Sequence, residues 1–125
     1  MSWDIVLFSS TQKINSVEEI DEEKLVVINF DKILFEHFTV YKQEDNYVEI
    51  IGNNFSINLF TDDELVSNKM ISLYGENALF ELAKLALINN WQIYDSGINR
   101  MIDLEKPNEN GYANFQSYLY LIMDK

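Results

Sequence analysis

The side chains that could do chemistry in this sequence are few, and the first is an isolated histidine. His37 is the only histidine of the chain, so a catalytic triad or a histidine zinc site would have to use it. It falls on an apolar helical repeat that begins at Phe30, and no serine, cysteine or second histidine is its neighbour. The chain has no cysteine, which excludes disulfides, thiolate metal ligands and a cysteine nucleophile. We expect His37 to be a structural residue at the edge of the core.

Carboxylates offer two further kinds of site. Asp62, Asp63 and Glu64 are oxygen ligands of the type that binds divalent cations, but the alternating spacing of a calcium loop is absent. Asp95 and Asp103 flank an expected hairpin and could form an acid–base pair, although an Asp that begins a turn usually accepts backbone N–H bonds. The sequence contains no P-loop, dinucleotide fingerprint or nucleophile elbow. We expect no catalytic residue, no metal and no cofactor.

Charge is the strongest compositional feature. The 125 residues carry 21 carboxylates against nine lysines and arginines, a formal net charge of −12. Such a field repels phosphate backbones and anionic lipid, so we expect neither nucleic-acid nor membrane binding. No apolar segment approaches the roughly 20 residues of a membrane span, and no signal peptide is evident, which favours the cytoplasm. The acidity is either a means of attracting a basic protein partner or a source of solubility.

The elements that position these residues are organised around residues 75–104. A helix over residues 77–90, apolar around most of its circumference, runs into an expected hairpin of residues 91–95 and 100–104. Further strands are predicted over residues 3–8, 47–51, 55–60 and 69–74, and further helices over 30–41 and 112–122. The sequence predicts one α+β domain over residues 1–125. Helices pack on one face of a mainly antiparallel sheet, in the order β-α-β-β-β-α-β-β-α.

Three short motifs resemble a family of small uncharacterised bacterial proteins. They are Ser2-Trp3-Asp4 at the start, Trp91 to Asp95 after the central helix, and Met101 to Pro107. The family pattern is SWD followed by GW…D…G…DL, and this chain has Asn90 where Gly is usual. None of these motifs is catalytic. The family in turn is similar to the small acidic proteins that accompany bacterial toxins as immunity proteins, and this resemblance implies binding of a toxin.

We therefore expect a non-enzymatic protein that binds another protein, in the favoured version an immunity-type inhibitor of a basic toxin such as a nuclease. The competing hypotheses are a small-molecule binder or small enzyme with a pocket between sheet and helix, and an interaction module with no toxin. The expected partner-binding residues are the carboxylates of two short acidic clusters: Glu18, Glu19, Glu22, Glu23, Asp62, Asp63 and Glu64. We also expect that changing Asp62, Asp63 and Glu64 to Asn or Gln leaves the melting temperature unchanged or raises it.

Overall fold

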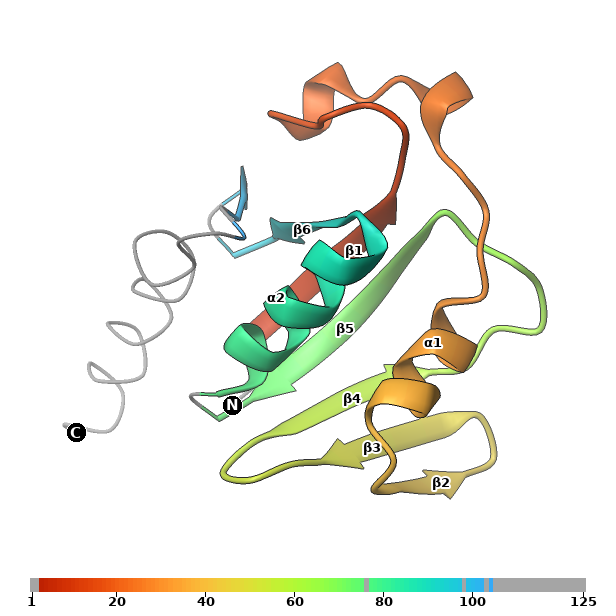
Figure 1. Cartoon of the computed structure of the whole chain (residues 1–125), viewed down its shortest axis with the longest axis vertical. Helices are drawn as coiled ribbons and strands as arrows, with labels where there is room; N and C mark the ends of the chain where they lie inside the picture. Colours follow the sequence, from red (N-terminus) through yellow and green to blue (C-terminus); the bar gives the residue numbers. More distant parts are fainter. Residues whose placement is uncertain (1–2, 76, 98, 103, 105–125) are drawn as a thin grey trace, which may run out of the picture.

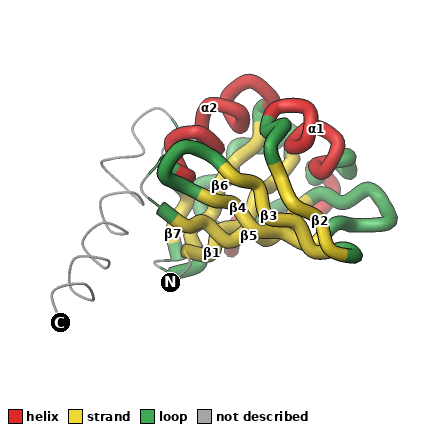
Figure 2. The backbone as a smooth tube through the Cα atoms, turned by 90° about the horizontal axis from the view of Figure 1, so that it is seen from below, coloured by secondary structure: helices red, strands yellow, loops and turns green. Residues whose placement is uncertain are grey.

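The computed structural model describes residues 3–75, 77–97, 99–102 and 104. Within these ranges, seven strands form one antiparallel sheet in the order β2-β3-β4-β5-β1-β6-β7. Two α-helices lie on the same face of this sheet, as Figure 2 shows, while the opposite face carries no described helix. This arrangement confirms the predicted α+β class.

The strands are β1 (Trp3–Ser9), β2 (Tyr41–Glu44), β3 (Tyr47–Ile51), β4 (Ser56–Phe60), β5 (Asn68–Tyr74), β6 (Trp91–Asp95) and β7 (Arg100–Met101). The helices are α1 (Phe30–His37) and α2 (Ala78–Asn89), with 3-10 turns η1 (Val17–Glu19) and η2 (Glu22–Lys24) between β1 and α1 (Figure 1). The observed order differs from the predicted one by the additional strand β2. The predicted final helix over residues 112–122 lies outside the described residues.

Helix α1 begins as predicted and ends early. The side chain of Asn29 accepts a hydrogen bond from the backbone N–H of Lys32 at 3.0 Å, the contact expected of an N-cap. The helix stops at His37, and Phe38 is already extended. His37 is exposed rather than at the core edge, and its ring lies 4.6 Å from that of Phe38. The predicted core-edge position of His37 is therefore wrong, because the core-facing stripe of α1 consists of Phe30 and Leu34.

The missed strand β2 begins at Tyr41, a residue predicted to lie on the apolar face of a longer helix. Tyr41 instead pairs with Ile50 of β3. The β-branched residues Thr39 and Val40 favour an extended chain at this point. The turn that follows places Asp45 at a φ of 55°, a conformation that Asp tolerates better than most residues. A two-residue turn thus closes a hairpin where helical periodicity alone predicted a helix.

Helix α2 is the main apolar element above the sheet. Six of its residues are buried: Ala78, Leu79, Leu82, Ala83, Leu85 and Ala86. Ile88 is 72% exposed and Leu87 is 49% exposed. The buried part of α2 is therefore narrower than the apolar arc predicted from the sequence. The sheet covers only one side of the helix, so an apolar arc as wide as this one extends beyond it.

Beneath α2, the sheet contributes side chains in strict alternation. In β1, Trp3, Ile5 and Leu7 are buried, whereas Asp4 on the other face is exposed. Ile57 and Leu59 of β4 are likewise buried, as predicted. Further buried contributions come from Val48, Ile50, Ile71, Leu73, Trp91 and Ile93. Trp91 packs against Phe30 of α1 with ring centroids 4.9 Å apart, which ties the two helix regions into one core.

Two residues with positive φ flank α2. Gly75 has a φ of 92°, and a Cβ there would lie 2.4 Å from the backbone oxygen of Asn54, so only glycine fits. Asn90 ends the helix at a φ of 59°, in the left-handed conformation that Asn accepts better than most residues. Because Trp91 follows at once, Asn90 directs the chain into β6, between β1 and the edge strand β7.

Candidate functional site

The two acidic clusters lie on two loops at the same end of the sheet. Glu18 and Glu19 belong to η1, and Glu22 and Glu23 to η2, in the connection from β1 to α1. Asp62, Asp63 and Glu64 lie in the connection from β4 to β5. All seven carboxylate residues are exposed, and the side chain of Asp62 is 40% exposed.

Backbone hydrogen bonds join these two loops. Ile28 donates to the carbonyl of Val66 at 2.9 Å, and Val66 donates back to Ile28 at 3.1 Å. Near the end of β1, Ser9 donates to the carbonyl of Ser67 at 2.9 Å and accepts from Val26 at 2.8 Å. The acidic loops therefore form one connected end of the molecule, although no described contact brings the two carboxylate clusters together.

One member of the second cluster is already engaged by a buried lysine that the sequence analysis missed. Lys69 of β5 is 5% exposed and donates from Nζ to the carbonyl of Phe60 at 2.5 Å and to Oδ2 of Asp62 at 2.6 Å. Oδ1 of Asp31, the second residue of α1, lies 2.9 Å from the same Nζ as an ion pair. The other oxygen of Asp31 accepts the backbone N–H of Asp62 at 2.9 Å. We call Lys69, Asp31 and Asp62 the buried ion cluster.

The buried ion cluster holds the β4–β5 connection, which carries the second acidic cluster, against the start of α1. Asp62 is consequently a structural residue, and only Asp63 and Glu64 of its trio remain for an outside partner. The sequence held a signal for Lys69, since it shares the alternation of Ile71 and Leu73, which both face the core. Alternation alone does not identify the partners of Lys69, because Asp31 and Asp62 lie on other segments of the chain.

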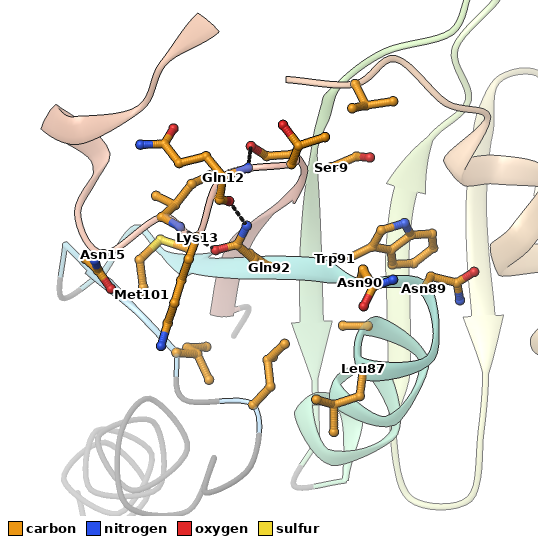
Figure 3. Close-up of a pocket in the computed structure, with 17 residues that line it drawn as sticks. Ser9, Gln12, Lys13, Asn15, Leu87, Asn89, Asn90, Trp91, Gln92 and Met101 are labelled. Carbon is orange, nitrogen blue, oxygen red and sulfur yellow. Dashed lines mark hydrogen bonds between the residues drawn. The ribbon is translucent and has the colours of Figure 1, made fainter. Parts of the chain in front are cut away.

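A pocket of about 1100 Å³ opens beside the end of α2 and the start of the β1–α1 connection (Figure 3). Its polar lining comes mostly from hydroxyl and amide side chains: Ser9, Ser10, Thr11, Gln12, Asn15, Asn89, Asn90 and Gln92. Apolar side chains of Leu87, Met101, Ile102 and Leu104 form another part of the wall. The described lining contains no carboxylate and one cation, Lys13, whose side chain points away from Ser9 in Figure 3.

Two glutamines shape the upper wall of this pocket. Gln92 of β6 donates to the carbonyl of Gln12 at 2.8 Å and accepts from the backbone of Ile14 at 2.7 Å. Gln12 in turn donates to the carbonyl of Glu19 at 2.8 Å and accepts from the backbone of Asp21 at 2.8 Å. The same network thus fixes both the pocket wall and the first acidic cluster. Gln92 thereby links strand β6 to the connection that carries the first acidic cluster.

The other candidate chemical groups have structural surroundings. Asp95 is 1% exposed and accepts the backbone N–H of Gly97 at 2.8 Å, which is the turn role predicted for it. Asp103, its expected partner, lies outside the described residues. Among the described residues, no three His, Asp or Glu side chains are grouped to hold a metal ion.

The two tryptophans and Tyr94 lie in different surroundings. Trp3 and Trp91 are buried in the core at 6% and 2% exposure. Tyr94 is half-buried and points to the face without helices, where its hydroxyl hydrogen-bonds to the side chain of Asn99. The C-terminal tyrosines lie outside the described residues. Within the described part of the chain, neither helix is long and apolar enough to cross a membrane.

Comparisons of the chain with protein-family models, with curated proteins and with solved structures found no match.

Proposed function

We propose that this protein works by binding another protein that presents a basic surface. The observation that carries the proposal is the set of exposed carboxylates on two hydrogen-bonded loops, within a chain of net charge −12. Six of these carboxylates make no described ion pair with the chain's own cations: Glu18, Glu19, Glu22, Glu23, Asp63 and Glu64. Their negative potential is free to act on a partner.

Electrostatics of this kind acts mainly on the rate of encounter. Complementary fields steer two proteins together and raise the association rate, and salt weakens the effect because the Debye length shortens. Isolated surface charges add little to stability, so such clusters are not explained by folding. Loops fixed at both ends by backbone and glutamine hydrogen bonds also hold the carboxylates in place before the partner arrives.

The specific version of the proposal is an immunity-type inhibitor of a basic toxin, active in the cytoplasm of a bacterium. Its supports are the acidity and the resemblance of the Trp91 region to small acidic bacterial proteins. If this version holds, expression of the chain protects cells from a toxin encoded beside its gene. Cells that die equally with and without the chain would exclude this version while leaving the general proposal standing.

The general proposal is tested by association kinetics with a partner isolated from the producing cells. We expect Glu18→Gln, Glu19→Gln, Glu22→Gln and Glu23→Gln together to slow association at low salt and much less at high salt. A second variant, Asp63→Asn with Glu64→Gln, spares the buried ion cluster and should act in the same direction. Exposed Glu36 of α1 provides a matched control through Glu36→Gln. Unchanged association in both loop variants would reduce the acidity to a source of solubility.

The pocket supports a second candidate function, the binding of a small molecule. A chain with 21 carboxylates has placed none of them in the described lining, where Lys13 is the cation. Amides, hydroxyls, one ammonium and an apolar wall suit a small organic acid with an apolar part. We expect organic acids, but not organic amines, to raise the melting temperature with concentration, because a ligand that binds the native state stabilises it. Lys13→Gln should remove this shift, whereas Lys32→Gln on the exposed side of α1 should not.

A further inference from the structure

The side of the sheet opposite the helices carries an ordered surface that the acidic loops do not explain. We call it the open face. Figure 2 shows the two described helices on one side of the sheet and none on the other. Strand alternation sends every second side chain of each strand to this side. The open face therefore has a composition that follows directly from strand register.

Register lines up apolar side chains across the open face. Directly paired residues of antiparallel strands place their side chains on the same side, so one face can be followed from strand to strand through the pairings. Tyr47 lies opposite Phe60, and Val6 lies opposite Met70. Asn58 of β4 lies opposite Ser72 of β5, and alternation over two further residues places Phe60 and Met70 on the same face as this pair. The apolar side chains on this face, which we call the apolar row, are those of Tyr47, Phe60, Met70, Val6, Tyr94 and Met101.

The most exposed part of the apolar row is its middle. Phe60 is 62% exposed and Met70 is 63% exposed, which is unusual for such large side chains in a strand. Tyr47 stands beside Phe60 with ring centroids 5.2 Å apart and is 39% exposed. Aromatic residues and Met are enriched in protein interfaces, and Met adapts its shape to different partners.

A second row beside the first is polar and carries negative charge. It runs from Glu49 through Asn58 and Ser72 to Asp4 by direct pairing. The hydroxyl of Ser72 donates to Asp4 at 2.7 Å and so fixes the carboxylate next to the apolar row. Along this row of described residues, the one cation is Lys42, which pairs with Glu49 at the edge of the sheet.

From these two rows we infer that the open face is the surface on which a basic protein docks. Apolar side chains of the partner lie on Phe60 and Met70, and its lysines or arginines reach Asp4 and Glu49. This inference rests on the proposed function and names the surface that holds the partner after the acidic loops have attracted it. Charge complementarity selects this occupant, because a second copy of the chain would bring another −12 charges against the same face.

The inference is tested by crosslinking in living cells. A photoreactive phenylalanine analogue replaces Phe60 in the full chain, and in separate variants it replaces Glu19 on the acidic loop or Ile88 on the outer side of α2. Ile88 is the matched control, since it is 72% exposed and apolar but lies on the helix side of the sheet. Crosslinked proteins are identified by mass spectrometry, and the identified partner is then purified for binding assays.

We expect crosslinks from position 60 to a basic protein and none from position 88. In the binding assay, Phe60→Ala with Met70→Ala should weaken affinity at least about tenfold, in the range of an interface hot spot. Ile88→Ala should change it less than about twofold. Asp4→Asn with Glu49→Gln should also weaken it, and more strongly at low salt. All of these are exposed or half-buried positions, and a thermal melt of each variant verifies its fold.

Each other outcome overturns a defined part of the account. Crosslinks from position 60 only to further copies of the chain would mean that the open face is a dimer interface. Crosslinks from position 19 but not from 60 would overturn the open face and leave the proposed function standing. Crosslinks from neither position would overturn both. An affinity unchanged by the Phe60 and Met70 variant would also remove the open face from the binding surface.

Discussion

The buried side chain of Lys69 holds groups from three separate segments together. Its ammonium group contacts the Phe60 carbonyl, Asp62 and Asp31 of α1. The two carboxylates neutralise its positive charge. Such a cluster need not be more stable than an apolar core of the same shape. Removing one member is costly, however, because the remaining carboxylates then lie beside the core without their counter-ion.

We predict that Lys69→Met lowers the free energy of unfolding by about 3–5 kcal/mol. Lys84→Met is the control, since Lys84 forms an exposed pair with Glu81 on α2, and its loss should cost less than about 1 kcal/mol. Urea denaturation of both variants gives the comparison. Equal costs would show that the Lys69 cluster behaves as an ordinary surface ion pair.

The buried ion cluster also changes the expectation for the second acidic cluster. Neutralising Asp62, Asp63 and Glu64 together was expected to leave stability unchanged or raised. Because Asp62 neutralises Lys69, we now predict that Asp62→Asn alone lowers the melting temperature, whereas Asp63→Asn with Glu64→Gln does not. Thermal melts separate the two. A melting temperature unaffected by Asp62→Asn would mean that Asp31 alone satisfies the lysine.

In the core, burial sets the cost of truncation. Leu82 of α2 is fully buried and Ile88 is 72% exposed. We predict that Leu82→Ala costs about 2–5 kcal/mol through lost burial and a cavity. Ile88→Ala should cost about 0.5 kcal/mol or less, as surface changes usually do. If Ile88→Ala cost more than Leu82→Ala in a urea melt, the side of α2 that carries Ile88 would be the one that packs on the sheet.

At the scale of elements, the junction between α2 and β6 depends on one backbone conformation. Asn90 holds a φ of 59°, and residues other than Gly, Asn and Asp adopt this region only at a cost of roughly 1–2 kcal/mol. We predict that Asn90→Gly keeps or slightly raises stability, whereas Asn90→Ala lowers it by about 1 kcal/mol. Urea melts of the two variants test this. If Asn90→Ala were the more stable of the two, the backbone strain at this junction would be negligible.

Local patterns predicted the elements whose burial follows a simple period. Strands β1, β3, β4, β5 and β6 and helix α2 were expected close to where they lie, because alternation or a broad apolar arc dominates each of them. Strand β2 was missed because all its residues are exposed, so burial leaves no pattern there, and only pairing with β3 stabilises it. That pairing is a contact between two strands, and the sequence of β2 alone does not reveal it.

The functional surfaces were predictable to a different degree. The exposed carboxylates of Glu18 and Glu64 could be predicted from composition, because unpaired charge stays at the surface. Neither the pocket nor the apolar row could be predicted, since each joins side chains from four or more separate segments. The row exists only through strand register, which brings Val6 beside Met70 and Tyr94. The roles of Asp62 and Lys69 likewise required the tertiary contact with α1.

At the scale of the whole molecule, two surfaces divide the work of binding. The acidic loops extend beyond one end of the sheet and act at long range, whereas the open face offers apolar contact at short range. Long-range charge changes the association rate, while buried apolar anchors set how long a complex lasts. The two surfaces therefore make separable contributions to one affinity.

The account is tested most directly by measuring the association and dissociation rate constants for the crosslinked partner. The measurement uses two variants at two salt concentrations. The loop variant with Glu18, Glu19, Glu22 and Glu23 changed to Gln should associate more slowly, most of all at low salt, with dissociation little changed. The open-face variant Phe60→Ala with Met70→Ala should dissociate faster, with association little changed at either salt concentration. Two variants that alter the same rate constant in the same way, or neither rate constant, would contradict the account.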